Sequence, residues 1–170
     1  MLVLLTGASG AGKSTYACNL VKALSGNITF ISTEIPQPEI KADAEALRRE
    51  GFVFVERFTD VAGLDISGGA AILDCLCNLT ANEMFDEIEN VRGNVADKIT
   101  KNILALNSRF ELLVVITNDV SSDGNSYTEG TSEYIKTLCE INRTLAAAAY
   151  AVYELCVSIP TVIKGELLLN

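Results

Sequence analysis

Close to its N-terminus the chain carries the octapeptide Gly7-Ala-Ser-Gly-Ala-Gly-Lys-Ser14, and no other segment constrains its architecture as strongly. This octapeptide matches the pattern G-x-x-x-x-G-K-[ST] at every fixed position. The preceding run, residues 1–5, is wholly apolar, which is typical of a buried parallel strand. Apolar residues at helical spacing follow it as far as Leu24. A strand, a glycine-rich turn and a helix in this order predict a P-loop.

The composition of the loop fits the binding of phosphate groups. Its glycines allow successive backbone N–H groups to turn inward, and the start of the following helix adds its dipole. In such loops the lysine, here Lys13, reaches the β- and γ-phosphates, and the hydroxyl, here of Ser14, ligates Mg²⁺. We therefore expect ATP or GTP to bind with Mg²⁺. The predicted nucleotide-binding residues are Gly7, Ala8, Ser9, Gly10, Ala11, Gly12, Lys13, Ser14 and Thr15.

Strand and helix patterns alternate along the rest of the chain, without a repeat or a linker. Such alternation favours an α/β protein: a single-domain P-loop NTPase fold spanning residues 1–170, with a mainly parallel sheet and helices on both faces. The expected strands are 28–31, 52–55, 70–73, 111–116, 151–157 and 161–163. The expected helices are 14–24, 39–50, 80–108 with a break at 93–94, and 131–149, and residues 60–66 are expected to form a short helix or turn.

Asp74 closes the apolar run 70–73 and is the natural second metal-binding group. A carboxylate at the carboxyl end of a parallel strand faces the crevice in which ligands bind. The alternative is that Asp74 caps the helix that follows.

Composition excludes several classes of function. The 170 residues include 22 acidic and 13 basic side chains, a formal charge of −9, which disfavours a nucleic-acid binder. There is no histidine, so a histidine zinc site and a Ser-His-Asp triad are excluded. The apolar N-terminus is too short for a signal peptide, and no run approaches the ~18 apolar residues of a membrane span. We expect a cytoplasmic protein without a membrane span.

Four segments carry a resemblance to a known family. They are residues 4–14, the stretch Ile72-Leu-Asp-Cys-Leu-Cys-Asn-Leu-Thr-Ala-Asn82, the strand end Val115-Ile-Thr-Asn-Asp-Val120, and Ile141-Asn-Arg-Thr-Leu-Ala-Ala-Ala-Ala149. In this order they resemble the bifunctional adenosylcobinamide kinase / adenosylcobinamide-phosphate guanylyltransferase family of cobalamin biosynthesis, over almost the whole chain. The resemblance implies phosphorylation of the aminopropanol hydroxyl of cobinamide with ATP or GTP and Mg²⁺. It also implies a second reaction, transfer of GMP from GTP through a guanylylated histidine, and a homotrimer.

The resemblance also implies where the substrates bind. Thr33 and Glu34, after the second strand, and Asn118 and Asp119, after the fifth, match segments that line the family's cleft. A strand-to-loop cap and an Asx turn are the respective alternatives. Lys13, Ser14 and Asp74 carry over as the phosphate and metal groups. Lys13, Asp74 and Glu34 are the candidate catalytic residues, and either Asp74 or Glu34 is expected to act on the acceptor hydroxyl.

The chain departs from the family at the histidine. Arg48 and Arg49 stand about where a histidine pair would be expected. An arginine has no free nucleophilic nitrogen, so it cannot carry a covalent guanylyl group. The pair either binds substrate phosphate or belongs to a solvated helix face. We therefore expect a divergent member of the family in which guanylyl transfer is doubtful.

The P-loop predicts phosphoryl transfer, and the resemblance implies that the chain is a cobinamide kinase of cobalamin biosynthesis or salvage that works by in-line displacement. Another small-metabolite kinase is less favoured, because residues 118–130, the candidate lid, contain no lysine or arginine. A nucleotide-binding module with a regulatory or structural role is the alternative from a different class.

Overall fold

The computed structural model describes residues 1–35, 38–85, 94–120 and 127–169. Within these ranges the strands are β1 (Leu2–Thr6), β2 (Ile28–Ser32), β3 (Val53–Glu56), β4 (Gly68–Asp74), β5 (Phe110–Ile116), β6 (Ala151–Cys156) and β7 (Ile159–Lys164). The helices are α1 (Lys13–Leu24), α2 (Pro38–Arg49), the 3₁₀ turn η1 (Val61–Gly63), α3 (Leu76–Phe85), α4 (Val95–Asn107) and α5 (Glu129–Ala148).

The strands form one sheet in the order β3-β2-β4-β5-β1-β6-β7. Every neighbouring pair is parallel except β6 and β7, which form an antiparallel hairpin. The expectation of a mainly parallel sheet is confirmed. Because the parallel strands all point the same way, their carboxyl ends meet along one edge of the sheet. That edge carries both the loop after β1 and Asp74 at the end of β4, with β5 between them.

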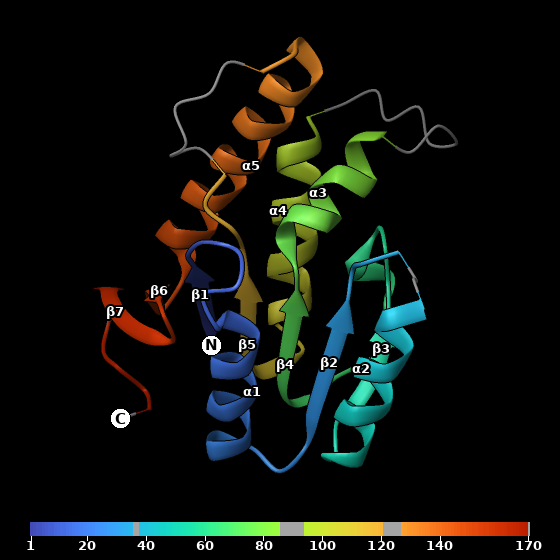
Figure 1. Cartoon of the computed structure of the whole chain (residues 1–170), viewed down its shortest axis with the longest axis vertical. Helices are drawn as coiled ribbons and strands as arrows, with labels where there is room; N and C mark the ends of the chain where they lie inside the picture. The colour runs from blue at the N-terminus through green and yellow to red at the C-terminus, as the bar shows by residue number, and fades with distance from the viewer. Residues whose placement is uncertain (36–37, 86–93, 121–126, 170) are drawn as a thin grey trace.

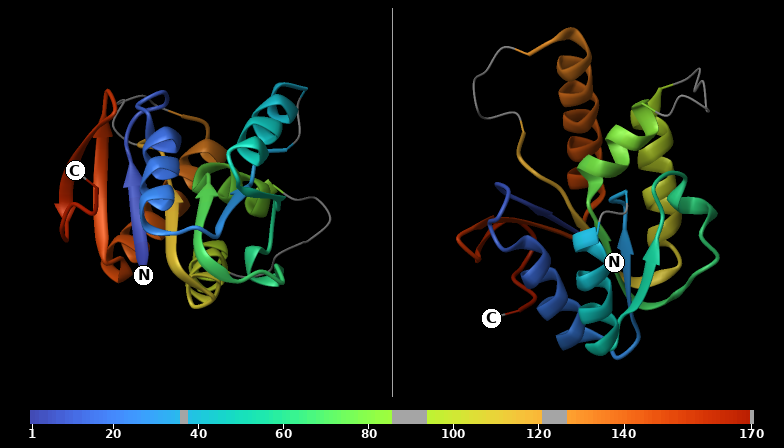
Figure 2. Two further views of the ribbon diagram at one scale, coloured as in Figure 1. Left: turned by 90° about the horizontal axis from the view of Figure 1, so that it is seen from below. Right: turned by 45° about the vertical axis from the view of Figure 1, so that its right-hand side comes forward.

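Helices cover both faces of the sheet, as expected. Helices α1 and α2 lie on one face, and α4 and α5 lie on the other (Figures 1 and 2). The central strands β1, β4 and β5 are buried between these layers, which explains their nearly continuous apolar sequences. Helix α3 contacts α4 and α5 above the carboxyl edge of the sheet (Figure 1).

The expected helix over 80–108 was wrong in its start. Helix α3 begins at Leu76, because Leu76 and Leu79 pack fully buried against the core directly after β4. The break expected at 93–94 coincides with the start of α4, whose Asn94 accepts hydrogen bonds from the backbone of the first turn. Residues 86–93 of the expected helix, and 121–126 of the expected polar stretch, lie outside the described residues.

Candidate functional site

The glycine-rich loop packs closely against the β6–β7 hairpin. Gly12 has a φ of 88°, and a Cβ built on it would strike the side chain of Ser158 in the hairpin turn. The N–H of Ser158 donates to the carbonyl of Ala11 at 2.9 Å. A Cβ on Gly7 would likewise strike the carbonyl of Leu155 in β6. The hairpin therefore fixes the shape of the loop from outside, and sequence patterns gave no sign of this long-range contact.

Lys13 lies inside the loop. Its side chain is 6 % exposed, and its Nζ donates to the carbonyl oxygens of Gly7 at 3.0 Å and Ala8 at 2.6 Å. Burial lowers the pKa of the Lys13 ammonium, and the neighbouring Asp74 acts against this shift. The Lys13 Nζ is therefore held against the backbone carbonyls at the start of the loop.

Ser14 and Asp74 come together across the crevice. The Ser14 hydroxyl donates to Oδ2 of Asp74 at 2.7 Å, joining the first turn of α1 to the end of β4. Burial raises the pKa of Asp74 above its ordinary value, partly offset by the Ser14 hydrogen bond and by Lys13. A hydroxyl and a carboxylate at this separation suit Mg²⁺, which takes hard oxygen ligands and binds proteins through one or two carboxylates plus phosphate oxygens. Asp74 lies two residues before the first residue of α3, Leu76.

These side chains surround one cavity of about 410 Å³. The loop supplies one wall, and Asp74, Cys75, Ile116 and Asn118 supply the other. Thr15, at the start of α1, also lines it. A smaller cavity of about 290 Å³ shares Asp74 and Asn118 and adds Glu34 and Phe54. The structure thus brings together most of the residues that the sequence singled out.

Thr33 lies behind the wall of these cavities. It is fully buried, and its hydroxyl both donates to the carbonyl of Cys75 at 2.7 Å and accepts from the N–H of Cys75 at 2.8 Å. Its own N–H donates to the carbonyl of Asp74 at 2.9 Å. This geometry joins the end of β2 to the end of β4, so Thr33 holds the peptide that carries Asp74.

Arg48 and Arg49 lie on the exposed side of α2 and do not line either cavity. The Arg48 guanidinium lies over the ring of Phe54, at 5.2 Å from its centroid. Arg49 pairs with Glu45 one turn earlier, at 3.2 Å. Their guanidinium groups are therefore engaged by α2 itself and by β3.

Asp119 contacts the start of the glycine-rich loop and lines a different cavity from the one around Lys13. Its N–H donates to the carbonyl of Gly7 at 3.2 Å, and its exposed side chain lines a cavity of about 310 Å³ with Asn142 of α5 and Glu154 of β6. Asn118 borders both this cavity and the one around Lys13.

Two thiols follow Asp74 directly. Cys75 and Cys77 are buried, and the sulfur of Cys77 accepts the N–H of Asn118 at 3.3 Å. The Cys75 thiol and this N–H lower the pKa of Cys77, whereas the pKa of Cys75 is raised by its contact with Cys77 and by burial. The pair joins the start of α3 to the end of β5.

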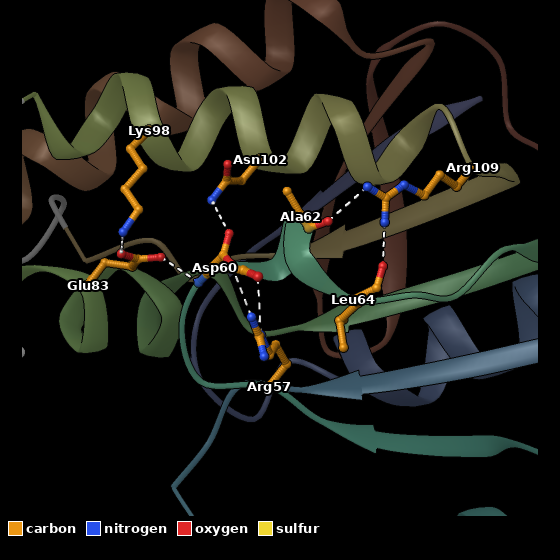
Figure 3. A network of polar contacts seen from close by, with 8 residues as sticks. All are labelled: Arg57, Asp60, Ala62, Leu64, Glu83, Lys98, Asn102 and Arg109. Atoms are coloured by element: carbon orange, nitrogen blue, oxygen red, sulfur yellow. Dashed lines mark hydrogen bonds and ion pairs between the residues drawn. The ribbon is translucent and has the colours of Figure 1, made fainter. Parts of the chain in front are cut away.

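Helix α3 adds two residues that sequence reasoning missed, Asn82 and Glu83. The Asn82 amide donates to the carbonyls of Thr33 at 2.8 Å and Phe58 at 3.0 Å, so it joins the loops after β2 and β3. Glu83 accepts the N–H of Asp60 and pairs with Lys98 of α4, both at 2.7 Å (Figure 3). Their only signal in the sequence is a polar pair on a largely apolar helix.

The polar network in Figure 3 continues along the loop between β3 and β4. Arg57 pairs with the Asp60 carboxylate at 3.1 Å, and the Asn102 amide reaches the same carboxylate from α4. Arg109 donates to the carbonyls of Ala62 and Leu64. This network fixes the loop to α3 and α4, beside the wall of the cavity that contains Glu34.

No helix in the described ranges has the length and apolar character that crossing a membrane requires.

Comparisons with known proteins give one family match. A family model described as cobinamide kinase / cobinamide phosphate guanyltransferase matches residues 3–163. A search of curated proteins found no matching relative.

Two solved structures align with most of this chain. An ATPase from the type III secretion system of pathogenic bacteria aligns with a TM-score of 0.57 and 12 % identity, covering 91 % of this chain and 50 % of that one. The P4 protein from bacteriophage phi6 in complex with ADP aligns with a TM-score of 0.45 and 12 % identity, covering 94 % and 52 %. The chain thus spans about half the length of each. The likeness to the first supports a P-loop α/β fold.

Proposed function

Since the chain belongs to the cobinamide kinase / cobinamide phosphate guanyltransferase family, we propose that it phosphorylates the hydroxyl of a cobinamide, with ATP or GTP as the donor and Mg²⁺ held by Ser14 and Asp74. The observation that carries this proposal is the meeting of Lys13, Ser14 and Asp74 around one cavity at the carboxyl edge of the sheet. Phosphoryl transfer requires a cationic side chain, backbone amides and a metal at one place. At this edge Lys13, the loop and the Ser14–Asp74 pair lie together, which supports the proposal.

The proposed reaction is an in-line displacement at the γ-phosphorus. The acceptor oxygen forms a bond to that phosphorus while the bond to the β–γ bridging oxygen breaks, and the acceptor proton leaves to a carboxylate. Mg²⁺ in such sites neutralises charge on the β- and γ-oxygens. In this proposal the loop amides and Lys13 hold the phosphates. Thr15, at the start of α1, lines the same cavity and contributes to nucleotide binding.

Glu34 is the carboxylate that we assign to the acceptor hydroxyl. Asp74 is already engaged by Ser14, whereas Glu34 is exposed and lines the adjoining cavity with Asp74 and Asn118. In this proposal Glu34 orients the hydroxyl and takes its proton. Asn118 and Asp119 contribute to substrate binding from the end of β5, and Thr33 contributes by holding Asp74.

The second activity of the family is proposed to be absent. The chain has no histidine to carry a guanylyl group. Arg48 and Arg49 stand in the corresponding helix, and their guanidinium groups contact Phe54 and Glu45. In this proposal the positive charge of the two arginines attracts the nucleotide phosphates at long range, but neither arginine offers a nucleophile.

We further propose a cytoplasmic homo-oligomer, a trimer by resemblance to the family. The antiparallel edge strand β7 supports association, because it exposes Ile159 and Ile163 at 65 % and 59 %. An exposed apolar edge strand is a common site of pairing between chains.

The proposed function is tested by supplying purified protein with cobinamide, Mg²⁺ and either ATP or GTP, and following products by mass spectrometry. We expect cobinamide phosphate and no GDP-cobinamide. Lys13→Ala should abolish the product, and Glu34→Gln should lower kcat while leaving nucleotide affinity unchanged. Formation of GDP-cobinamide would overturn the proposed loss of guanylyl transfer. Nucleotide binding without phosphorylation of cobinamide would instead favour a regulatory module or a kinase for another metabolite.

A further inference from the structure

A second large cavity beside the candidate site lies between α1 and α2, and we call it the α1–α2 groove. Its volume is about 610 Å³. Ser14, Thr15 and Asp74 form its inner end, and these three residues also line the cavity around Lys13. The two cavities therefore share the Ser14–Asp74 pair as a common wall, and the volume lies in the range typical of small-molecule sites.

The walls of the groove combine apolar and polar surface. Phe30 lies on the sheet at its base, where its ring stacks on Phe54 at 5.8 Å, and Leu47 of α2 forms one side. At the far end Lys22 of α1 pairs with Glu50, which follows α2, at 2.5 Å. An ion pair at a half-exposed position offers both hydrogen-bond donors and an acceptor to a ligand.

Asn19 adds a neutral polar group to this wall. It is exposed on α1, one turn after Thr15, and it lines the groove. An amide side chain both donates and accepts, so it can pair with an amide of a ligand. The groove thus offers an apolar base, polar rims and an inner end at the proposed metal pair.

We propose that the α1–α2 groove binds the hydroxyl-bearing, amide-linked arm of the acceptor. This inference rests on the proposed function. An acceptor oxygen must approach the γ-phosphorus from the side opposite the leaving group, and it must do so next to the metal pair. The groove ends at Ser14 and Asp74, so an arm lying in it presents its terminal hydroxyl there.

The size of the groove also restricts the kind of acceptor. A cavity of about 610 Å³ accommodates an arm with an amide and a hydroxyl but does not enclose a whole corrin macrocycle. The macrocycle of a cobinamide therefore stays at the mouth, near Lys22 and Glu50. The methylene and methyl groups of the arm lie against Phe30 and Leu47, and its amide pairs with Asn19.

The test is to fill the groove from an exposed position. Ala46 lines it and is exposed on α2, so Ala46→Trp places an indole in the groove without entering the core. Glu45→Trp is the matched control, because Glu45 is the adjacent exposed residue of α2 and does not line the groove. Cobinamide binding in the presence of Mg²⁺ and ADP is measured by equilibrium dialysis through its visible absorbance, and ADP binding is measured separately by calorimetry.

We expect Ala46→Trp to weaken cobinamide binding at least about 10-fold and to leave ADP binding within about twofold. Glu45→Trp should bind cobinamide and ADP with the same affinities as the unmodified protein. Asn19→Trp fills the groove from the opposite wall and should reproduce the effect, which keeps the test decisive if Ala46→Trp fails to fold.

Unchanged cobinamide binding in a folded groove-filling variant would overturn the inference, even if the unmodified protein phosphorylates cobinamide. Loss of ADP binding together with cobinamide binding would also overturn it, because the groove would then belong to the nucleotide. Failure of the unmodified protein to phosphorylate cobinamide would instead overturn the proposed function.

Discussion

The carboxylate of Asp74 serves the proposed function but destabilises the fold. Its carboxylate is needed beside Ser14 to hold the metal, yet burial raises its pKa, so the ionised form is disfavoured in the folded protein. A group whose pKa is raised on folding weakens the fold at every pH above that pKa. The penalty is lost as the pH falls from the folded-state pKa toward the ordinary value of aspartate. At neutral pH the charged Asp74 carboxylate therefore lowers the free energy of unfolding.

Asp74→Asn should separate these two effects. The neutral amide keeps the shape of the side chain, so thermal unfolding at pH 7 should move to a higher Tm. The Tm difference from the unmodified protein should shrink as the pH falls and the native carboxyl becomes protonated. Metal-dependent phosphorylation should fall about 100-fold or more, because metal ions supply several kcal/mol of transition-state stabilisation. Asp65→Asn, at an exposed carboxylate, is the control, and a lower Tm for Asp74→Asn than for this control would contradict the argument.

Some site residues could be predicted from the sequence around them, and others could not. Lys13 and Ser14 could be predicted because their roles follow from a contiguous loop, and Asp74 because a carboxylate ended an apolar run. The location of Thr33 could not be predicted from its neighbours, because its hydroxyl bonds with Cys75, which is distant in the chain. The sequence pointed to the correct segment but not to a buried, positioning location for that residue.

Among the elements, the β6–β7 hairpin acts as a brace for the glycine-rich loop. Its turn has φ values of 45° at Val157 and 67° at Ser158, which turn the Ser158 N–H toward the carbonyl of Ala11. The loop carries positive φ at Gly10 and Gly12. Of these two positions, only Gly12 lies within contact distance of the hairpin, because nothing lies within 4 Å of a Cβ built on Gly10.

This difference predicts unequal effects of adding a methyl group. Gly10→Ala should destabilise the protein by about 1–2 kcal/mol, the usual penalty for a left-handed backbone in a residue other than glycine. Gly12→Ala should be worse, because its Cβ also strikes Ser158. Ser158 itself has a left-handed φ of 67°, so Ser158→Gly should stabilise either variant to some degree. It should recover more of the Gly12→Ala loss than of the Gly10→Ala loss, because only at Gly12 does it also remove the clash. Urea unfolding measures all four variants, and equal losses at the two glycines would show that the hairpin does not brace the loop.

Helix α3 is the second element with a positioning role. Asn82 joins the loop that carries Thr33 to the loop after β3, and Glu83 fixes Asp60 of the latter loop to α4 (Figure 3). The early start of α3 at Leu76 follows from burial against the core, which competes with the local cap signals used to place helix ends. Because the start of α3 was misplaced, the positions of Asn82 and Glu83 relative to the sheet could not be predicted from the sequence.

Asn82→Ala should slow the reaction without disturbing the nucleotide. It leaves the carbonyls of Thr33 and Phe58 without their amide donor, which typically destabilises a protein by about 1–3 kcal/mol. The loop with Glu34 then loses its fixed position, so kcat should fall about 10-fold or more. Nucleotide affinity should stay the same, because Asn82 does not line the cavity around Lys13. Equal losses in kcat and nucleotide affinity would indicate general unfolding, which circular dichroism of the variant would reveal.

For the whole molecule, the class of fold could be predicted and the order of the strands could not. Alternating strands and helices indicate a parallel sheet, but nothing in residues 110–116 places β5 between β1 and β4. That order results from packing of the crossover helices on both faces. It nevertheless determines the site, because the gap between the ends of β1 and β4 leaves room for the cavity lined by Ile116 and Asn118. The formal charge of −9 is compatible with an anion site because that site is local.

The two edges of the sheet differ in their exposed side chains, and this difference locates the proposed association between copies. Strand β7 exposes Ile159 and Ile163 and belongs to a hairpin, whereas β3 at the opposite edge is a four-residue strand ending in Glu56. Ile159→Lys should therefore weaken the oligomer, since a lysine on an edge strand opposes pairing. Val53→Lys makes the matching change on β3, at a residue 53 % exposed, and should leave association unchanged. Sedimentation equilibrium measures both variants. A monomeric unmodified protein, or dissociation by Val53→Lys alone, would exclude β7 as the interface.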